Sequence, residues 1–288
     1  MLAGAAIGRL AIVAGSGQLP MRLAEAAREA GHTPFVLPII GAADQDWSGF
    51  AHADLAIADL ASFAAITRRE EISHAVLSGG IARRPGLGEF RPTWRMIPAV
   101  PRIFRALVSG GDDAVLRSVI GLLESVGVKV VGAHEVVPGL LATGGPLGAV
   151  SPDAAACRDI AAAARAALEL GRLDIGQGAI SVGGRVIALE GLEGTDDMLA
   201  RVARLRAEGR LPAGRRGVLV KLCKPMQDMR ADLPSIGPGT VENAGRAGLA
   251  GIAVEAGRAL VLDRDALIAA ADRAGIFVSG IDPADLAP

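Results

Sequence analysis

The chain has 288 residues, which is enough for two domains of ordinary size. Hydrophobic residues make up 51% and charged residues 21%, with both signs mixed and a formal net charge of −1. This balance argues against nucleic acid as a partner, because neutralising phosphates requires a basic face. The two cysteines, Cys157 and Cys223, lie far apart and outside any C-x-x-C pair. We therefore expect a reduced, cytoplasmic protein without a structural zinc site.

The first half of the chain alternates short apolar runs with stretches of helical periodicity. Residues 9–14 predict a buried strand, and Pro20 suits the first turn of a helix that Gly31 ends. Strands that alternate with helices predict a parallel sheet with helices on its faces. We therefore expect an N-terminal Rossmann-like parallel α/β domain over residues 1–135. Its other expected elements are strands at 33–40, 74–77 and 128–131 and helices at 61–71 and 112–127.

A stretch rich in Gly and Pro, residues 136–151, separates this domain from the rest of the chain. Prolines interrupt it, so we expect a linker and not a membrane-spanning helix. Residues 152–288 predict a C-terminal mixed α/β (α+β) domain, in which Thr195 and Thr240 open two helices. Its other expected elements are a helix at 152–170, a hairpin of 177–182 and 185–189, and strands at 217–223, 252–254, 259–262 and 276–278.

Two glycine-containing loops follow apolar strands of the N-terminal domain. Gly15-Ser16-Gly17-Gln18 leads into a helix, and backbone N–H groups at a helix start favour a phosphate or another anion. Ser78-Gly79-Gly80-Ile81 follows the apolar run 74–77, at the sheet edge where ligands gather in open α/β sheets. These eight residues are predicted substrate contacts, although two unrelated turns would leave the same pattern. A nicotinamide site is disfavoured, because Pro20 stands where the dinucleotide fingerprint has its third glycine.

Four carboxylates fall within the eight residues from Glu190 to Asp197. Oxygen ligands of this kind suit Mg²⁺ better than zinc, so Glu193 and Asp196 are candidate metal ligands. The alternative is structural, because Asp196 and Asp197 would also stabilise the start of the helix that Thr195 opens.

The densest group of chemically active side chains lies in residues 224–240. Lys224 and Arg230 are suited to neutralise phosphate oxygens, and Asp228 and Asp232 are suited to hold a divalent cation or to orient water. Phosphoryl transfer needs this inventory, since positioning and charge neutralisation supply most of its catalysis. The alternative is a surface loop whose ions pair with each other.

Lysine is rare in this chain, with three lysines against 27 arginines. Lys221 and Lys224 fall in one tetrapeptide. Lysine that persists in such a background indicates a need for a compact ammonium in place of a planar guanidinium.

Residues 89–111 combine basic and apolar side chains, among them Trp94, Phe90, Phe104 and four arginines. This combination suits a membrane interface or a lipid ligand. A core-packed helix with solvated arginines is the alternative.

The chain as a whole resembles the UDP-2,3-diacylglucosamine pyrophosphatases of the LpxI type, over roughly residues 9 to 280. The resemblance rests on several segments in the same order, and the most specific is KPMQDMRADLPSIGPGT from Lys224. The other segments are GSGQLP from Gly15, SGGIARRP from Ser78, GGDD from Gly110, DIGQ from Asp174, EGLEGTDDML from Glu190 and AGLAGIAVEAGRALVLD from Ala247.

This resemblance implies Mg²⁺-dependent hydrolysis of the pyrophosphate of UDP-2,3-diacylglucosamine in lipid A biosynthesis. Water attacks the α-phosphorus and gives UMP and 2,3-diacylglucosamine 1-phosphate (lipid X). The resemblance also implies two domains with the lipid substrate between them, and a homodimer. The family's essential aspartate maps onto Asp228, next to Gln227. We expect a cytoplasmic enzyme that associates peripherally with the inner membrane.

A nicotinamide-dependent oxidoreductase and a noncatalytic lipid-binding protein are the two alternatives to this hydrolase. The expected catalytic residues are Asp228, Gln227, Lys224, Arg230 and Asp232. The expected metal ligands are Asp228, Asp196 and Glu193, and the substrate contacts are the two glycine loops with Gln177, Thr195 and Thr240.

Overall fold

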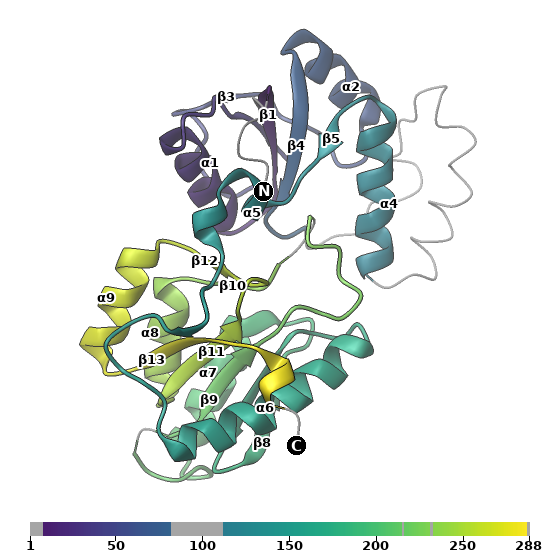
Figure 1. The fold of residues 1–288 in the computed structure, drawn as a ribbon. Coiled ribbons are helices and arrows are strands. Elements are labelled where there is room, and N and C mark those ends of the chain that lie inside the picture. The colour runs from purple at the N-terminus through teal and green to yellow at the C-terminus, as the bar shows by residue number, and fades with distance from the viewer. Residues whose placement is uncertain (1–7, 82–111, 215, 231–232, 287–288) are drawn as a thin grey trace. The chain divides into compact units, whose positions relative to one another are not determined.

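A computed structural model describes residues 8–81, 112–214, 216–230 and 233–286 (Figure 1). The chain forms two compact units. Unit 1 comprises the described residues up to Gly139 together with those of the segment 228–232. Unit 2 comprises Leu140–Gln227 and the described residues from Leu233 onward. Unit 1 contains a parallel sheet and unit 2 a mixed sheet, each packed against helices, which confirms the expected fold class.

Unit 1 is built on a five-stranded sheet in the order β3-β2-β1-β4-β5, with every pair parallel. The central strand β1 (Arg9–Ala14) pairs with β2 (Phe35–Pro38) on one side and with β4 (Ile72–Ser78) on the other. The edges are the two-residue strands β3 (Ala51–His52) and β5 (Lys129–Val130). This order places the carboxyl ends of β1 and β4 side by side.

Helices pack on both faces of this sheet. Ala11 and Val13 of β1 share a core cluster with side chains of α2 (Leu60–Arg69) and α4 (Asp112–Ser125). Helix α1 (Leu19–Glu29) contacts β1 and β4 and lies apart from α2 and α4 (Figure 1). Alternate residues of a strand point to opposite faces, so β1 is buried on both sides, which explains its uninterrupted apolar sequence. Helix α5 (Ala133–Val136) and the 3-10 helix η3 (Pro138–Leu140) follow β5.

Unit 2 is built on a six-stranded mixed sheet in the order β6-β13-β11-β9-β7-β8. Strands β9, β11 and β13 run parallel, whereas β7 is antiparallel to both β9 and β8. Strands β7 and β8 therefore form the hairpin expected around Gly183-Gly184. The strands are β6 (Gly145–Pro146), β7 (Gly178–Val182), β8 (Arg185–Leu189), β9 (Val218–Lys221), β11 (Gly251–Glu255) and β13 (Phe277–Ile281), and β10 (Ser235–Ile236) and β12 (Leu260–Val261) form a separate parallel pair.

The two faces of this sheet carry different helices. Val218 and Val220 of β9 pack with α6 (Ala154–Arg172), the expected Ala-rich helix. Leu219, which points to the opposite face, packs with three other helices. These are α7 (Gly194–Ala207), α8 (Pro238–Arg246) and α9 (Arg264–Ala274), and the 3-10 helix η4 (Pro283–Leu286) follows β13.

Two expected helix starts are wrong. Helix α7 begins at Gly194, and the Thr195 hydroxyl lies inside its first turn and donates to Glu190, a strong acceptor that the sequence pattern does not reveal. Helix α8 begins at Pro238, because proline is favoured in the first turn of a helix. Thr240 lies within that turn, where its Oγ1 accepts the N–H of Gly237 at 3.3 Å.

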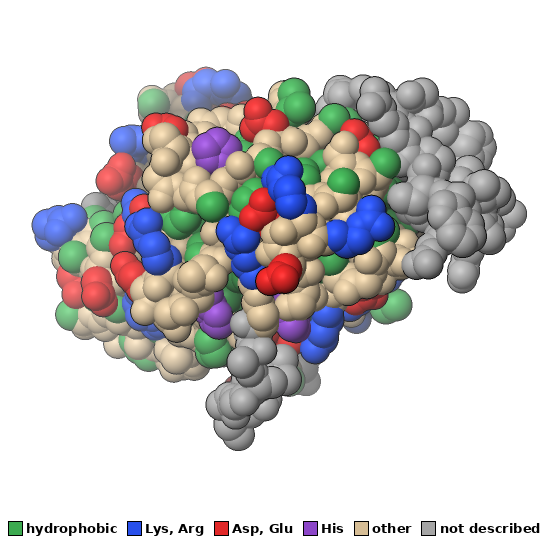
Figure 2. Space-filling view, turned by 90° about the horizontal axis from the view of Figure 1, so that it is seen from above, with side chains coloured by type: hydrophobic (Ala, Val, Ile, Leu, Met, Phe, Trp, Pro, Cys, Tyr) green, Lys and Arg blue, Asp and Glu red, His purple; other side chains and the backbone are tan. Residues whose placement is uncertain are grey.

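The stretch expected as a linker contains β6, which pairs with β13 in antiparallel fashion. In the part of the chain that the structure describes, no helix combines the length and hydropathy needed to cross a bilayer. Residues 89–111, which we expected to contact a membrane or lipid, lie outside the described residues. Figure 2 shows acidic and basic side chains interspersed over one face of the molecule, in keeping with the mixed composition.

Candidate functional site

The two glycine loops predicted to bind substrate lie together at the carboxyl edge of the unit 1 sheet. The N–H of Gly15 donates to the Ser78 carbonyl at 2.8 Å, and the N–H of Ser16 donates to the Gly80 carbonyl at 2.8 Å. The N–H of Gly80 donates back to the Ser16 carbonyl at 3.1 Å. The Ser16 hydroxyl also donates to the Gly80 carbonyl, at 3.1 Å. The loops therefore form one continuous hydrogen-bonded surface.

Close backbone contact explains the glycines in these loops. A Cβ atom at Gly15 would lie 2.3 Å from the Gly80 carbonyl oxygen, closer than real Cβ contacts allow. Gly79 has a φ of +85°, and a Cβ there would lie 2.6 Å from the Ser16 carbonyl oxygen. The side chain of Ile81 is 46% exposed. Gly17 and Gln18 are exposed as well, so this surface is open to solvent next to the start of α1.

A carboxylate that the sequence pattern did not indicate lies at the start of α1. Asp44 accepts the N–H of Gly17 through both carboxylate oxygens, each at 3.1 Å. Hydrogen bonds from the Gln45 side chain and the Gly17 N–H hold the pKa of Asp44 below its ordinary value of 3.8. The anion expected at this helix start is therefore supplied by the protein itself. A phosphate that binds the Gly17 N–H must displace Asp44.

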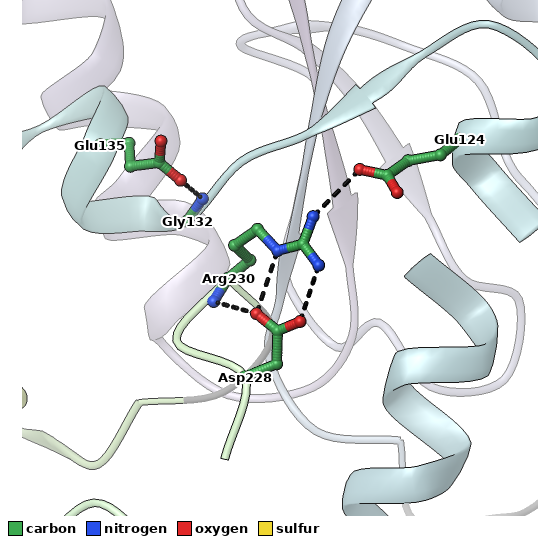
Figure 3. Close-up of polar contacts among 5 residues, drawn as sticks. All are labelled: Glu124, Gly132, Glu135, Asp228 and Arg230. Atoms are coloured by element: carbon green, nitrogen blue, oxygen red, sulfur yellow. Dashed lines mark hydrogen bonds and ion pairs between the residues drawn. The ribbon is translucent and has the colours of Figure 1, made fainter. Parts of the chain in front are cut away.

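Asp228 is held by Arg230, two residues further along the chain (Figure 3). Its Oδ1 accepts the backbone N–H and the Nε–H of Arg230, both at 3.0 Å, and its Oδ2 accepts Nη2–H at 2.7 Å. The remaining guanidinium nitrogen, Nη1, donates to Glu124 of α4 at 3.0 Å. Figure 3 shows the guanidinium of Arg230 between the two carboxylates. Since all three residues belong to unit 1, the segment around Asp228 is anchored there.

This pairing determines the charge of Asp228. Hydrogen bonds from the Arg230 guanidinium and N–H, with the positive charges of Arg230 and Arg117, lower the pKa of Asp228 below 3.8 despite its partial burial. Asp228 in turn raises the pKa of Arg230. Asp228 is therefore an anion at neutral pH. It can coordinate a cation or orient a water molecule, but it is a weak general base, because an effective base has a pKa near the operating pH.

Gln227 is buried and organises the backbone just before Asp228. Its Oε1 accepts the backbone N–H of Lys224 at 3.0 Å and the thiol of Cys223 at 3.3 Å. The backbone N–H of Cys223 donates to the buried carboxylate of Glu255 at 2.9 Å. Gln227, which we expected to be catalytic, therefore fixes the conformation of residues 223–227. Glu255 was missed, although a charged residue directly after a buried strand was a usable signal.

Lys224, another expected catalytic residue, forms an ion pair within unit 2. Its Nζ lies 2.7 Å from Oδ1 of Asp174, and the two side chains are 14% and 28% exposed. Asp174 belongs to the DIGQ segment and has a φ of +55°. The ion pair joins these two motif segments, and it leaves Lys224 with a carboxylate partner.

Two expected substrate contacts, Gln177 and Thr195, meet at Glu190. Glu190 is buried, its Oε1 accepts the Thr195 hydroxyl, and its Oε2 accepts the backbone N–H of Gln177 at 3.3 Å. The side-chain Oε1 of Gln177 is buried and has no hydrogen-bond partner among the residues that the structure describes. This group lies where the carboxyl ends of β8, β9 and β11 meet the amino end of β7. That edge of the unit 2 sheet therefore gathers most of the predicted polar residues of this unit.

The remaining expected residues are dispersed in the structure. Glu193 forms an ion pair with Arg201 at 3.4 Å, and Asp196 accepts the side-chain amide of Asn243 at 2.8 Å. Asp232 lies outside the described residues. Over residues 8–81, 112–214, 216–230 and 233–286, no three His, Cys, Asp or Glu side chains are grouped to hold one ion. The assignment of Asp228, Asp196 and Glu193 as metal ligands therefore stays a prediction.

Comparison with known proteins assigns both units. The family model of the LpxI N-terminal domain matches residues 9–140, and that of the LpxI C-terminal domain matches residues 143–279. The chain is 43% identical over 276 residues to the UDP-2,3-diacylglucosamine pyrophosphatase LpxI of Caulobacter vibrioides. That alignment covers 96% of this chain and 98% of the relative.

The two α/β units and this similarity together define the class of protein, which is a hydrolase. More narrowly, the chain belongs to the LpxI family, as the resemblance in its motifs predicted.

Proposed function

We propose that the chain hydrolyses the pyrophosphate bond of UDP-2,3-diacylglucosamine and releases UMP and 2,3-diacylglucosamine 1-phosphate, a step of lipid A biosynthesis. One observation carries this proposal: the chain is 43% identical, over nearly its whole length, to a relative with that substrate in its name. Asp228, Gln227 and Lys224 lie in the most specific motif of the resemblance, and each has partners that fix its position.

In the proposed reaction, a water oxygen bonds to the α-phosphorus. The bond from that phosphorus to the bridging oxygen breaks, and the bridging oxygen leaves with the lipid phosphate. Asp228 orients the water or a bound cation, and Arg230 keeps Asp228 ionised and fixed. Lys224 is suited to meet a phosphate oxygen if it exchanges its contact with Asp174. Gln227 acts indirectly, by fixing the chain before Asp228.

Mg²⁺ fits this site as an ion shared with the substrate. Mg²⁺ is usually held by one or two carboxylates together with substrate phosphates and waters, and needs no cage made only of protein. Asp228 supplies one such carboxylate, which three hydrogen bonds from Arg230 hold in place. Asp228 would hold the ion. When bound, Mg²⁺ would neutralise charge on the pyrophosphate.

We further propose a homodimer that works at the cytoplasmic side of the inner membrane through peripheral contact. The family resemblance supports both statements. The acyl chains of the substrate support the second, since burying them in a bilayer stabilises association by about 0.8 kcal/mol per CH₂ group.

The proposal is tested by incubating the full chain with UDP-2,3-diacylglucosamine and Mg²⁺ in ¹⁸O-labelled water. We expect Mg²⁺-dependent release of UMP that carries one ¹⁸O atom, and lipid phosphate without label. Label confined to the lipid phosphate would overturn attack at the α-phosphorus. No release of UMP, combined with retention of the lipid, would favour a noncatalytic lipid-binding protein instead.

A further inference from the structure

Lys221 is a buried cation that has no carboxylate partner among the described residues. Its side chain sits at the carboxyl end of β9 and the residue is 6% exposed. Within the described residues its Nζ makes one hydrogen bond, to the backbone carbonyl of Ser235 at 3.2 Å, and no ion pair. A lysine ammonium carries three N–H donors, so two of them have no acceptor in this part of the chain.

The neighbouring cations differ in this respect. Lys224 is paired with Asp174, and Arg230 is paired with Asp228 and Glu124. Three basic side chains thus occur within ten residues of the motif region, and only Lys221 has no carboxylate partner among the described residues.

Glu190, whose carboxylate lies near the strand position that pairs with Lys221, already accepts hydrogen bonds from other groups. Gly178 pairs with Lys221 across the sheet, so positions 178 and 221 share a face. The Glu190 carboxylate lies against Gly178 on that face, since a Cβ at Gly178 would meet Glu190 Oε2 at 2.7 Å. Glu190 accepts the Thr195 hydroxyl and the Gln177 N–H and forms no ion pair with Lys221.

Such a placement is costly for the fold. Moving an unpaired charge out of water is strongly unfavourable unless hydrogen bonds or a counter-charge compensate it. An anionic ligand would supply a counter-charge that the described residues do not supply.

The first turn of α8 closely follows the residue that accepts this hydrogen bond. Ser235, the acceptor of the Lys221 hydrogen bond, lies three residues before Pro238, where α8 begins. Gly239 is exposed, and its N–H has no acceptor in the described part of the chain, as is usual in the first turn of a helix. The positive end of the helix dipole adds to the charge of the buried ammonium.

We propose that Lys221 and the first turn of α8 form a subsite for one phosphoryl group of the substrate. This inference rests on the proposed pyrophosphate hydrolysis and adds a residue and a location to it. It also accounts for a lysine in a chain with 27 arginines, because a compact ammonium fits a buried point contact with a phosphate oxygen and a planar fork does not.

The test compares Lys221→Met with a matched control, Lys129→Met, in the full chain. Met keeps the length of the side chain and removes its charge. Lys129 is exposed on β5 of unit 1 and has no part in the proposed site. For each protein, Tm is measured against increasing orthophosphate, pyrophosphate and UMP, and kcat and KM are measured with UDP-2,3-diacylglucosamine.

We expect Lys221→Met to have a Tm equal to or above that of the wild type without phosphate, because an uncompensated charge is removed. The rise in Tm with pyrophosphate should disappear, and KM should increase at least tenfold. Lys129→Met should match the wild type in every measurement.

The contrary outcomes can be distinguished from one another. A Tm response and KM unchanged in Lys221→Met overturn the subsite and leave the proposed function intact. A large fall in Tm without phosphate shows that Lys221 stabilises the fold itself, and also overturns the inference. A response to free orthophosphate that depends on Lys221, with KM unchanged, means that the subsite binds free phosphate and not the substrate. If the wild type releases no UMP but shows a Lys221-dependent response to pyrophosphate, the proposed function fails and the anion site stands.

Discussion

Arg230 is the residue whose removal separates the positioning of Asp228 from its chemistry. The replacement Arg230→Met removes two side-chain contacts to Asp228, of 3.0 and 2.7 Å, and one to Glu124. The backbone N–H of residue 230 still donates to Asp228. The size of the effect is measured by a double-mutant cycle with Asp228→Ala, which isolates the coupling energy between the two side chains.

The exposure of the two side chains sets the expected magnitude. Asp228 is 17% exposed and Arg230 is 37% exposed. Fully exposed ion pairs contribute about 0–1 kcal/mol, and buried hydrogen bonds to charged groups about 1.5–3 kcal/mol. We therefore expect a coupling energy of about 1–2 kcal/mol for this half-buried pair. Turnover of Arg230→Met should fall about 10–100-fold, as for residues that orient a metal-binding carboxylate.

The coupling also has a predicted pH dependence. The folded-state pKa of Asp228 is lowered from 3.8, so the pair contributes its full stability above that value and loses it as pH falls through the lower, folded-state pKa. Urea or thermal unfolding of the four proteins should give a constant coupling energy at neutral pH and a smaller one well below pH 3.8.

The exposed pair Arg246–Glu242, at 3.7 Å with side chains 71% and 61% exposed, is the control cycle. Its coupling energy should not exceed about 0.5 kcal/mol. A coupling energy near zero for Arg230 and Asp228 at pH 7, or one that grows toward acid pH, would refute the reasoning.

Two further predictions concern the glycine loops and the buried carboxylate of unit 2. Gly15→Ala should lower Tm by several degrees, because its Cβ would lie 2.3 Å from the Gly80 carbonyl oxygen. As a control, a Cβ at Gly121 in α4 meets nothing within 4 Å, so Gly121→Ala should leave Tm equal or higher. Equal Tm values for the two variants would contradict the close approach at Gly15. Glu255→Ala should lower the free energy of unfolding by about 1–3 kcal/mol, since the Cys223 N–H loses its acceptor. It should also lower kcat. Glu255→Gln, which keeps an acceptor oxygen, should restore most of the activity, and failure of this rescue would show that the charge matters more than the hydrogen bond.

Much of the fold can be predicted from the sequence, because apolar runs indicate the buried strands. Residues 9–14 and 217–223 are almost entirely apolar and became the central strands β1 and β9. The hairpin at Gly183-Gly184 and the Ala-rich helix also follow from local pattern. Two-residue strands such as β6 and β10 are too short to show a period, so no local pattern predicts them.

The candidate site is harder to predict from the sequence, because its contacts join distant parts of the chain. The motif from Lys224 contains the expected side chains, but nothing in it indicates that residues 228–230 belong to unit 1 while Lys224 and Gln227 belong to unit 2. Asp44 and Glu255 act through hydrogen bonds to backbone groups 27 and 32 residues away. Such partners depend on the fold, and the residue type alone does not reveal them.

The central claim is that Asp228 carries the chemistry, and kcat of Asp228→Asn on UDP-2,3-diacylglucosamine tests it most directly. Asn has the same size and keeps an acceptor oxygen for Arg230, but it lacks the negative charge. We predict that kcat falls by about 10³-fold or more, while Tm changes by only a few degrees. Loss of one acid–base group typically lowers the rate by about 10²–10⁴-fold. A folded Asp228→Asn protein with kcat close to that of the wild type would contradict the account.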